Sequence, residues 1–220
     1  MSEFKCGNSI PNIANEEYDY LFSSPPCYED LSFFGVDIKE PETYKTKFLD
    51  LIVPLMKPKL GTVTISFTGA RRNNARILPK FLYLNLSFIE CDFYLRDVKY
   101  SKKSDSYNAY SSQILHIYTF QKKTIKGTYN LKNDKLYQRY GKDFWGPFGK
   151  ELKIDGEVVG QPIEIAEYCI ENFTNVGDIV FDPFAGIGTT LSAAKNLDRN
   201  YIGYELRDSI WNFGREHYGI

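Results

Sequence analysis

The chain has 220 residues, a net charge of −1 and 43% hydrophobic residues, a composition that can bury one sizeable core. We therefore expect a single domain over residues 1–220. No run of about 18 apolar residues occurs, which excludes a membrane-spanning helix, and the polar start MSEFKCGNSIPN lacks the apolar core of a secretory signal, so a cytoplasmic protein is expected.

Cysteine and histidine are sparse along the chain. The 4 cysteines form no CxxC pair, and there are 2 histidines. This pattern argues against a zinc site, and it predicts reduced thiols and no bound metal.

In chain order, the first clear pattern is the apolar run at 18–23, which predicts a strand. Residues 42–57 have the apolar spacing of a helix, with a kink expected at Pro54. The β-branched segment 62–67 predicts a second strand, and residues 76–86 predict another helix. Strands and helices therefore alternate in this half of the chain.

The pattern changes in the middle of the chain. Residues 92–100 and 113–121 predict a strand pair, whereas residues 122–160 have little periodicity and predict an excursion from the core. Beyond it, strands are expected at 179–184 and 201–205, and helices at 162–173, 189–197 and 208–217. This alternation predicts the α/β class, with a doubly wound, mostly parallel sheet and helices on both faces.

Charge is unevenly distributed. The segment 96–153 contains 13 Lys or Arg and 5 Asp or Glu, a local net charge of +8, interleaved with Tyr, Asn, Trp and Gly. Such a basic insertion suits a nucleic-acid phosphate backbone. On charge alone, a solvated Lys-rich surface is an equal alternative.

The segment SSPPCY at 23–28 follows the first predicted strand. Its two adjacent prolines stiffen the backbone. A hydroxyl, a thiol and a phenol lie beside them, so the segment is a candidate for chemistry by Ser24, Cys27 or Tyr28.

A second segment, DIVFDPFAGIGTTL at 178–191, runs from a strand through a Gly-x-Gly turn into a helix. Such a turn binds nucleotide-like ligands against backbone amides. Glu205, at the end of the next strand, lies about where an acidic residue would bind ribose hydroxyls. Leu191 replaces the third glycine of a dinucleotide fingerprint, which argues against a pyrophosphate. A ligand with a ribose and no phosphate fits better, and S-adenosylmethionine is such a ligand.

DPFAGIGTTLSAAKNLDRNYIGYEL closely resembles the cofactor segment of amino-methylating DNA methyltransferases, and SSPPCY resembles their catalytic segment. The catalytic segment comes first, as in the circularly permuted β group of that family. The resemblance includes CGNS at 6–9 and GQPIEIAEYCIENF at 160–173, and it covers residues 6–120 and 160–217. Residues 122–160 correspond only in position, as a target-recognition insertion. The resemblance implies a Rossmann-like methyltransferase fold.

The resemblance implies that the cofactor-binding residues are Asn8, Asp182, Phe184, Gly186, Gly188, Thr190 and Glu205. Gly186 and Gly188 would let the backbone approach the methionine half, and Thr190 would help to hold its carboxylate. Glu205 would bind both ribose hydroxyls. The alternative for each is structural, because glycine turns join strands to helices in many doubly wound folds, and Glu205 could cap a helix.

The resemblance also implies where the remaining residues would lie around the cofactor. Asp182 and Phe184 would shape the glycine turn. Asn8 would lie near the adenine ring, and Gln161 and Pro162 near the methionine end.

The resemblance implies a catalytic role for Ser24, Pro25, Pro26 and Tyr28. The Ser24 hydroxyl and the Pro25 carbonyl would accept hydrogen bonds from the amino group of a flipped-out base, and the nitrogen would attack the sulfonium methyl. SPPCY departs from the family's SPPY, so Tyr28 would stack on the base from a shifted position. Cys27 then reads as a small buried thiol. Serine before the prolines favours N4 of cytosine.

Several alternatives stay open. The same chemistry suits N6 of adenine or an amino group of RNA, and the Cys27 departure allows a catalytically silent relative that binds nucleic acid. A carbon-5 cytosine methyltransferase with Cys27 as nucleophile is disfavoured. The segment order is reversed, no Glu-Asn-Val segment is present, and no neighbouring cation would activate the thiol.

The expected macromolecular partner is double-stranded DNA with the target base flipped out, at a short target site. A homodimer and a cognate restriction endonuclease stay open as further partners. Expected DNA contacts are Arg71, Arg72, Lys99, Lys102, Lys103, Lys122, Lys123, Lys126 and Arg139.

Overall fold

The computed structural model describes residues 2–26, 41–68, 71–72, 76–77, 80–102, 114–127, 144–145, 152–154 and 157–220. Cys27, Tyr28, Lys103 and Arg139, which the sequence analysis singled out, lie outside these residues. Most of the expected target-recognition insertion at 122–160 does too.

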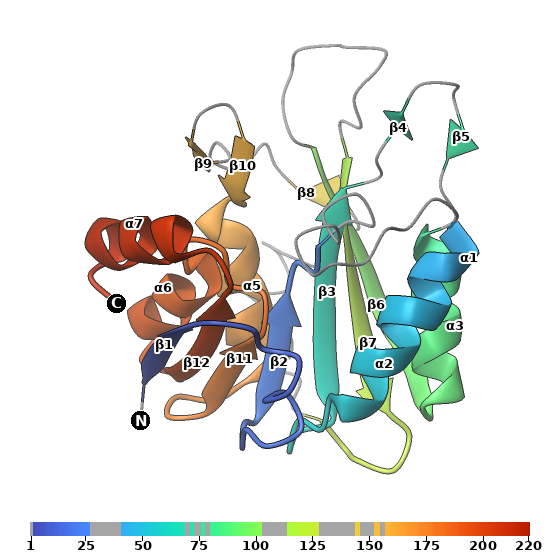
Figure 1. Cartoon of the computed structure of the whole chain (residues 1–220). Coiled ribbons are helices and arrows are strands. Elements are labelled where there is room, and N and C mark those ends of the chain that lie inside the picture. The colour runs from blue at the N-terminus through green and yellow to red at the C-terminus, as the bar shows by residue number, and fades with distance from the viewer. Residues whose placement is uncertain are drawn as a thin grey trace.

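An eight-stranded sheet forms the centre of the molecule, in the order β1-β12-β11-β2-β3-β7-β6-β8 (Figure 1). The strands are β1 Glu3–Cys6, β12 Asn200–Glu205, β11 Ile179–Asp182, β2 Tyr20–Ser23, β3 Thr62–Thr68, β7 Ile114–Lys122, β6 Phe93–Lys102 and β8 Phe144–Trp145. Neighbours from β1 to β3 are parallel, whereas β7 is antiparallel to both β3 and β6. The expectation of a doubly wound, mostly parallel sheet is confirmed.

Two short hairpins accompany this sheet. β9 Leu152–Ile154 pairs with β10 Glu157–Gly160, and β4 Arg71–Arg72 pairs with β5 Arg76–Ile77. In Figure 1 both hairpins lie beyond the carboxyl ends of the parallel strands. They therefore lie on the side where ligands of open α/β sheets bind.

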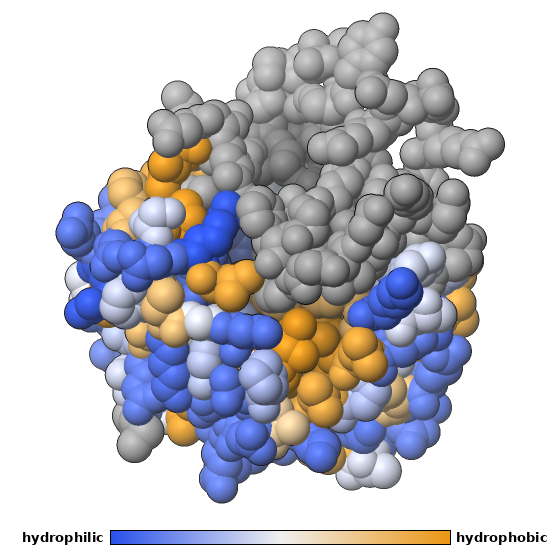
Figure 2. Space-filling view, in the orientation of Figure 1, coloured by the Kyte–Doolittle hydropathy of each residue, from blue (hydrophilic) through white to orange (hydrophobic). Residues whose placement is uncertain are grey.

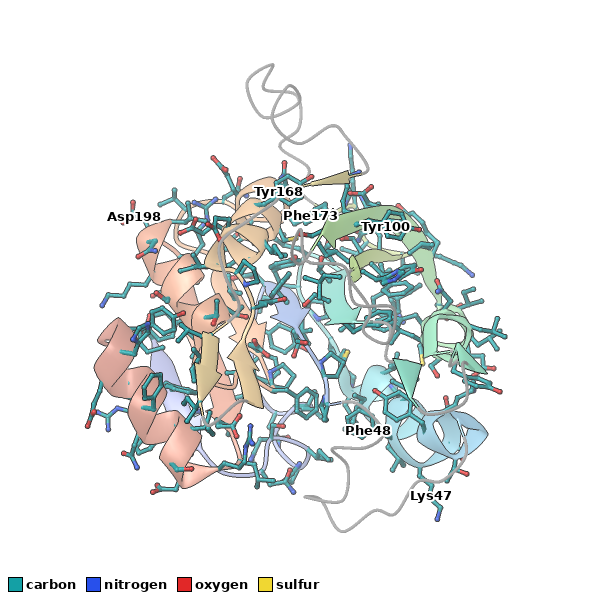
Figure 3. All side chains as sticks on the ribbon, turned by 90° about the horizontal axis from the view of Figure 1, so that it is seen from above. Lys47, Phe48, Tyr100, Tyr168, Phe173 and Asp198 are labelled. Carbon is teal, nitrogen blue, oxygen red and sulfur yellow. The ribbon has the colours of Figure 1, made fainter. Side chains whose placement is uncertain are left out.

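Helices cover both faces of the sheet, so the central strands are buried on both sides. On one side lie α1 Pro41–Tyr44, η2 Lys45–Leu49, α2 Asp50–Ile52, η3 Val53–Leu55 and α3 Lys80–Glu90, and on the other α5 Ile163–Phe173 and α6 Thr189–Asn196. Figure 3 shows Phe48 on the first side and Tyr168 and Phe173 on the opposite side. Tyr20 and Phe22 of β2 face the second core and Leu21 faces the first, which explains their near-complete burial.

The helix expected at 42–57 forms in segments. An α-helical turn is followed by the π segment η2, a short α-helix and the 3-10 turn η3, which contains Pro54. Proline has no N–H for the bond to residue 50, so the tighter last turn agrees with the expected kink.

Two other expectations need correction. The helix expected at 76–86 is α3, which begins at Lys80 and ends at Glu90, because residues 76–77 form β5. The strand β1 was not expected from the sequence. This edge strand has four residues and is partly exposed, so it lacks the apolar run that marks the inner strands.

The C-terminal helix α7, Asp208–Tyr218, packs near β1 and β12. The Trp211 indole donates a hydrogen bond to the Phe4 carbonyl at 3.0 Å. This contact joins the end of the chain to the edge strand that the sequence analysis missed.

On the face shown in Figure 2, hydrophilic residues cover most of the described surface, with apolar residues gathered toward its middle. Exposed apolar residues are ordinary on the surface of folded proteins. Among the described residues, no helix has the length and apolar character needed to cross a membrane.

The chain order reverses between β11 and β2. From β2 the chain proceeds to β3 on one side, and from β11 to β12 on the other. Ligands bind at such a switch point, outside the carboxyl ends of the strands. β2 ends at Ser23 and β11 at Asp182, so the two motif segments meet there.

Candidate functional site

A buried hydrogen bond joins the two motif segments. The Ser23 hydroxyl donates to Oδ1 of Asp182 at 2.6 Å, although the two residues are 159 positions apart in the sequence. Ser23 precedes the catalytic candidates Ser24 and Pro25, and Asp182 precedes the glycine turn. The structure therefore brings the expected catalytic and cofactor segments side by side.

Asp182 is held by donors on three sides. Besides Ser23, its Oδ1 accepts a hydrogen bond from the Phe184 amide at 3.0 Å, and its Oδ2 accepts one from the Thr190 hydroxyl at 2.6 Å. Burial, with a smaller contribution from the neighbouring Glu205, outweighs the three donors and raises the pKa of this carboxyl to about 6. The bond to the Phe184 amide agrees with the expectation that Asp182 shapes the turn.

Phe184 also fixes the turn through packing. Its ring lies 5.8 Å from the Phe48 ring, and the Phe48 ring lies 5.4 Å from the Tyr44 ring. The segment that contains η2 therefore supports the glycine turn from one side of the sheet.

The glycine turn has two residues in the left-handed region, Gly186 with φ 56° and Gly188 with φ 83°. The sequence analysis expected both glycines to make room for a cofactor. For Gly188 the structure adds a packing reason, because a Cβ there would collide with the end of the Ile220 side chain. Gly188 thus serves the backbone turn and the packing of Ile220. Room for a cofactor at both glycines stays a prediction.

Thr190 lies in the first turn of α6, and its side chain is buried. Its hydroxyl donates to Asp182 and so helps to position that carboxylate. A role of Thr190 in holding a cofactor carboxylate stays a prediction.

Glu205 ends β12 next to the glycine turn, and only 8% of its surface is exposed. Its Oε1 accepts hydrogen bonds from the Arg207 backbone N–H at 2.9 Å and from the Arg207 Nε at 3.3 Å. The Gly7 amide donates to the Glu205 carbonyl at 2.8 Å, and the Ala185 amide donates to the Tyr204 carbonyl at 2.8 Å. The ends of β1, β12 and β11 therefore converge around this carboxylate.

Asn8 lies in the loop that follows β1. Its Oδ1 accepts a hydrogen bond from the Ile10 amide at 3.0 Å, and its carbonyl accepts one from Asn12 at 3.2 Å. The side chain shapes its own loop and is exposed beside the end of β12.

The catalytic candidates Ser24, Pro25 and Pro26 differ in exposure and in hydrogen bonding. Ser24 is exposed, Pro25 is buried, and the Pro26 carbonyl accepts a hydrogen bond from the Tyr44 hydroxyl at 3.0 Å. The Pro26 carbonyl is therefore used internally, whereas the Ser24 hydroxyl faces the surface. The contacts of Tyr44 and Ser23 could not be predicted from the sequence, since no local pattern marks either one.

The segment at 152–162 approaches the glycine turn from another direction. Leu152 and Ile154 of β9 pack against the small buried cluster of Ile187 in the turn and Ile210 in α7. Gln161 Oε1 accepts a hydrogen bond from the Ser66 hydroxyl at 2.7 Å, near the carboxyl end of β3. The expectation that Gln161 lies near the site is compatible with this position.

Some of the expected DNA-contacting lysines lie elsewhere. Lys99 is 6% exposed and forms an ion pair with Asp97 at 2.7 Å. Lys122 donates to the Cys91 carbonyl at 2.6 Å, where β7 ends beside the amino end of β3. Lys123 and Lys126 follow in the same turn. Lys122, Lys123 and Lys126 therefore lie at the end of the sheet opposite Ser24, away from a base that would be held there. Lys99 lies level with Ser66, since both pair with Ile117, but it is largely buried.

Other basic candidates lie on the side of the site. Arg71 and Arg72 form β4, which closely follows the carboxyl end of β3. Lys102 ends β6 at the same level, because it pairs with Ile114 at the start of β7.

Solved structures of similar fold include a DNA methyltransferase and two complexes with S-adenosylmethionine. PvuII DNA methyltransferase, described as cytosine-N4-specific, matches with a TM-score of 0.77 and 17% identity, over 97% of this chain and 84% of that chain. The M1.HpyAVI–SAM complex matches with a TM-score of 0.70 and 22% identity, over 100% of both chains. TTHA0409 from Thermus thermophilus, complexed with S-adenosyl-L-methionine, matches with a TM-score of 0.75 and 19% identity, over 100% of this chain and 93% of that chain.

Sequence relatives include three named methyltransferases. The type II enzyme M.HindIII of Haemophilus influenzae is 44% identical over 63 residues, which are 29% of this chain and 20% of that protein. The type II enzyme M.MjaI of Methanocaldococcus jannaschii is 29% identical over 184 residues, 73% of this chain and 60% of that protein. The orphan enzyme M.BamHII of Bacillus amyloliquefaciens is 26% identical over 246 residues, 93% of this chain and 90% of that protein. The chain thus spans less than two thirds of M.HindIII and M.MjaI.

The family resemblance expected from the sequence is confirmed by a broader match. A family model described as DNA methylase, of the N6/N4 type, matches residues 36–212 and thus most of the chain. The chain belongs to the N6/N4 family of DNA methylases.

Proposed function

We propose that this protein transfers a methyl group from S-adenosylmethionine to an exocyclic amino group of a base in double-stranded DNA, with N4 of cytosine favoured. The observation that carries the proposal is the 2.6 Å hydrogen bond from Ser23 to Asp182. It joins the Ser-Pro-Pro segment to the glycine turn at the switch point of the sheet, where an open α/β sheet binds its ligand.

The cofactor would lie between the glycine turn and the end of β12. The positive φ of Gly186 turns the backbone there, and Glu205 offers a largely enclosed carboxylate for two ribose hydroxyls. These features fit a nucleoside with no phosphate. When bound, S-adenosylmethionine supplies a methyl group on a positively charged sulfur.

Ser24 and Pro25 would hold the base. The Ser24 hydroxyl is exposed, and it can accept a hydrogen bond from an amino group together with the Pro25 carbonyl. Two such acceptors draw the nitrogen away from conjugation with the ring, so that its lone pair points toward the methyl carbon. Neither oxygen is basic, so the main contributions are positioning and electrostatics, and the released proton leaves to solvent.

The choice of cytosine depends on the neutral side chain at position 24. The cytosine-N4 specificity of PvuII methyltransferase is compatible with this choice, although the 17% identity supports only the fold. Adenine N6 is the second candidate, because its amino group could use the same two acceptors.

Nucleoside mass spectrometry tests the proposal. Unmethylated duplex DNA and, separately, RNA are incubated with labelled S-adenosylmethionine and digested to nucleosides. N4-methylcytosine from DNA is the expected product. N6-methyladenine would reassign the base, 5-methylcytosine would restore Cys27 as nucleophile, and a product from RNA alone would overturn the DNA assignment. Cofactor binding with no product from either substrate would indicate a catalytically silent relative.

Two partner proposals accompany this function. M.MjaI and M.HindIII are named type II methyltransferases, which favours a cognate restriction endonuclease, whereas M.BamHII is named an orphan. Protection of methylated DNA from candidate endonucleases tests the first proposal. The second is a homodimer, which light scattering in solution tests.

A further inference from the structure

The Ser23–Asp182 contact continues into a buried network of four groups. Ser23, Asp182 and Thr190 are each at most 2% exposed, and both hydroxyls donate to the carboxylate at 2.6 Å. The Phe184 amide completes the set at 3.0 Å. Hydrogen bonds to a carboxylate in a buried setting are stronger than those between neutral groups.

This network begins where backbone pairing between β11 and β2 has ended. The pairs between these strands are Val180 with Tyr20 and Phe181 with Leu21. On its other side, β2 stays paired with β3 up to Ser23 and Ile65. At the opening of the site, the Ser23 side chain therefore provides the connection to β11 that the ladder does not.

Each end of the network leads into a functional segment. Ser24 and Pro25 directly follow Ser23, and the turn with Gly186 follows Asp182. The Asp182 carboxylate also contacts Thr190 in the first turn of α6, so it responds to both the turn and the helix behind it. A conformational change in the glycine turn could therefore shift Asp182, and through its hydrogen bond to Ser23 it could shift the neighbouring Ser24.

We propose that Ser23 is a positioning residue whose hydroxyl, through Asp182, holds the Ser24-Pro25 segment in register with the glycine turn and thereby lets cofactor binding order that segment. The catalytic consequence rests on the proposed function, whereas the ordering does not. The network couples the cofactor site at the glycine turn to the base site at Ser24-Pro25. Occupancy of one site then changes the affinity of the other by the same factor.

Hydrogen–deuterium exchange of the full chain provides the first test. Exchange of the amides at 18–24 is measured with and without S-adenosylmethionine, in wild type and in Ser23→Ala. Cofactor is expected to slow this exchange in wild type but not in Ser23→Ala. If cofactor slows it equally in both proteins, the proposed route is wrong.

Ser87→Ala is a matched control. The Ser87 hydroxyl is also buried, and it donates to the Asp50 carboxylate at 2.8 Å, but it belongs to α3. This variant should keep the cofactor-dependent slowing at 18–24. Loss of slowing in Ser87→Ala as well would mean that general destabilisation explains the result, and would overturn the proposal.

Steady-state kinetics provide the second test. Ser23→Ala should lower kcat about tenfold or more at saturating cofactor and DNA, while the cofactor Kd measured by calorimetry changes less than about threefold, because Thr190 and the Phe184 amide still hold Asp182. Ser23→Cys keeps nearly the same volume with a weak donor, so it tests the same loss if the alanine variant does not fold. An unchanged kcat in a folded variant would contradict the proposal. If wild type methylates nothing but the exchange result holds, the proposed function fails and the coupling stands.

Discussion

At the residue scale, adjacent serines have separate tasks. Ser23 is buried and bonded to Asp182, whereas Ser24 is exposed at the opening of the switch point. Alternation of side chains along an extended backbone places neighbours on opposite faces. One serine can therefore support the framework while the next faces a substrate.

Replacing Ser24 with alanine should impair turnover with little effect on cofactor binding. The base amino group would lose one of its two acceptors, so kcat should fall about tenfold to a hundredfold. The cofactor Kd should stay within about twofold, since Glu205 and the glycine turn are intact. Single-turnover kinetics and calorimetry measure the two quantities. Equal losses in both would contradict the role of Ser24.

Replacing Glu205 with glutamine should have the opposite effect. The amide keeps the shape but loses the charge that strengthens bonds to ribose hydroxyls, so the cofactor Kd should rise about tenfold. At saturating cofactor, kcat should remain close to wild type. Glu216→Gln, at an exposed position of α7, is the control and should leave both values unchanged. A lowered kcat with unchanged Kd would rule out this assignment.

Asp182 gives a prediction for pH. Burial raises its pKa from 3.8 to about 6, so the folded protein binds this proton more tightly than the unfolded chain does. Its contribution to stability is therefore fully present below the unfolded-state pKa and is lost as pH rises through about 6. Asp182→Asn should raise the free energy of unfolding at pH 7, and this gain should shrink as the pH is lowered to the unfolded-state pKa.

Urea unfolding at several pH values measures this effect. Activity should respond in the opposite sense, because protonation removes an acceptor for Ser23 and Thr190. Wild-type kcat should therefore fall below a pH of about 6, and Asp182→Asn should lack this acid limb. A variant less stable than wild type at pH 7 would contradict the argument.

At the scale of elements, the sequence predicted the features that depend on local pattern. The helix expected at 162–173 matches α5, and the strands at 62–67 and 113–121 match β3 and β7 closely, because their apolar spacing is strong. The partly exposed β1 had no such spacing.

The site was predictable only in part. The Ser-Pro-Pro segment and the glycine turn are local motifs, so both could be located. The Ser23–Asp182 contact and the anchoring of Pro26 by Tyr44 depend on which strands and helices are neighbours, which local spacing does not determine. The bond from Thr190 to Asp182 could not be predicted for the same reason.

Helix α7 packs closely on the glycine turn at Gly214, so a larger residue there should disturb the turn. A Cβ on Gly214 would overlap the backbone of Ile187, and backbone cannot move aside as a side chain can. Gly214→Ala should lower the free energy of unfolding by about 1–3 kcal/mol and weaken cofactor binding, because the turn must shift. Ser209→Ala, exposed on the same helix, is the control. Urea unfolding and calorimetry measure both effects, and an unchanged stability would show that α7 is free to move.

At the scale of the whole molecule, charge and geometry together decide where DNA would bind. From the sequence, the basic segment was expected to form one DNA-contacting surface. In the structure, the β6–β7 pair runs from one end of the sheet's strands to the other. The lysines of this pair are therefore divided between the two ends of the strands. Lys102 lies at the end near the site, and Lys123 lies at the opposite end. A base that enters at Ser24 brings its flanking phosphates to the end near the site only.

A pair of double variants tests this division. Arg71→Ala with Arg72→Ala should weaken DNA binding and reduce the slope of log K against log salt by about 1 for each phosphate contact that is lost. Lys123→Ala with Lys126→Ala removes the same charge from the opposite end, so it should leave the slope nearly unchanged. Fluorescence anisotropy with duplex DNA at several salt concentrations measures both. Equal loss of slope in the two variants would mean that net charge, and not the position of the site, governs binding.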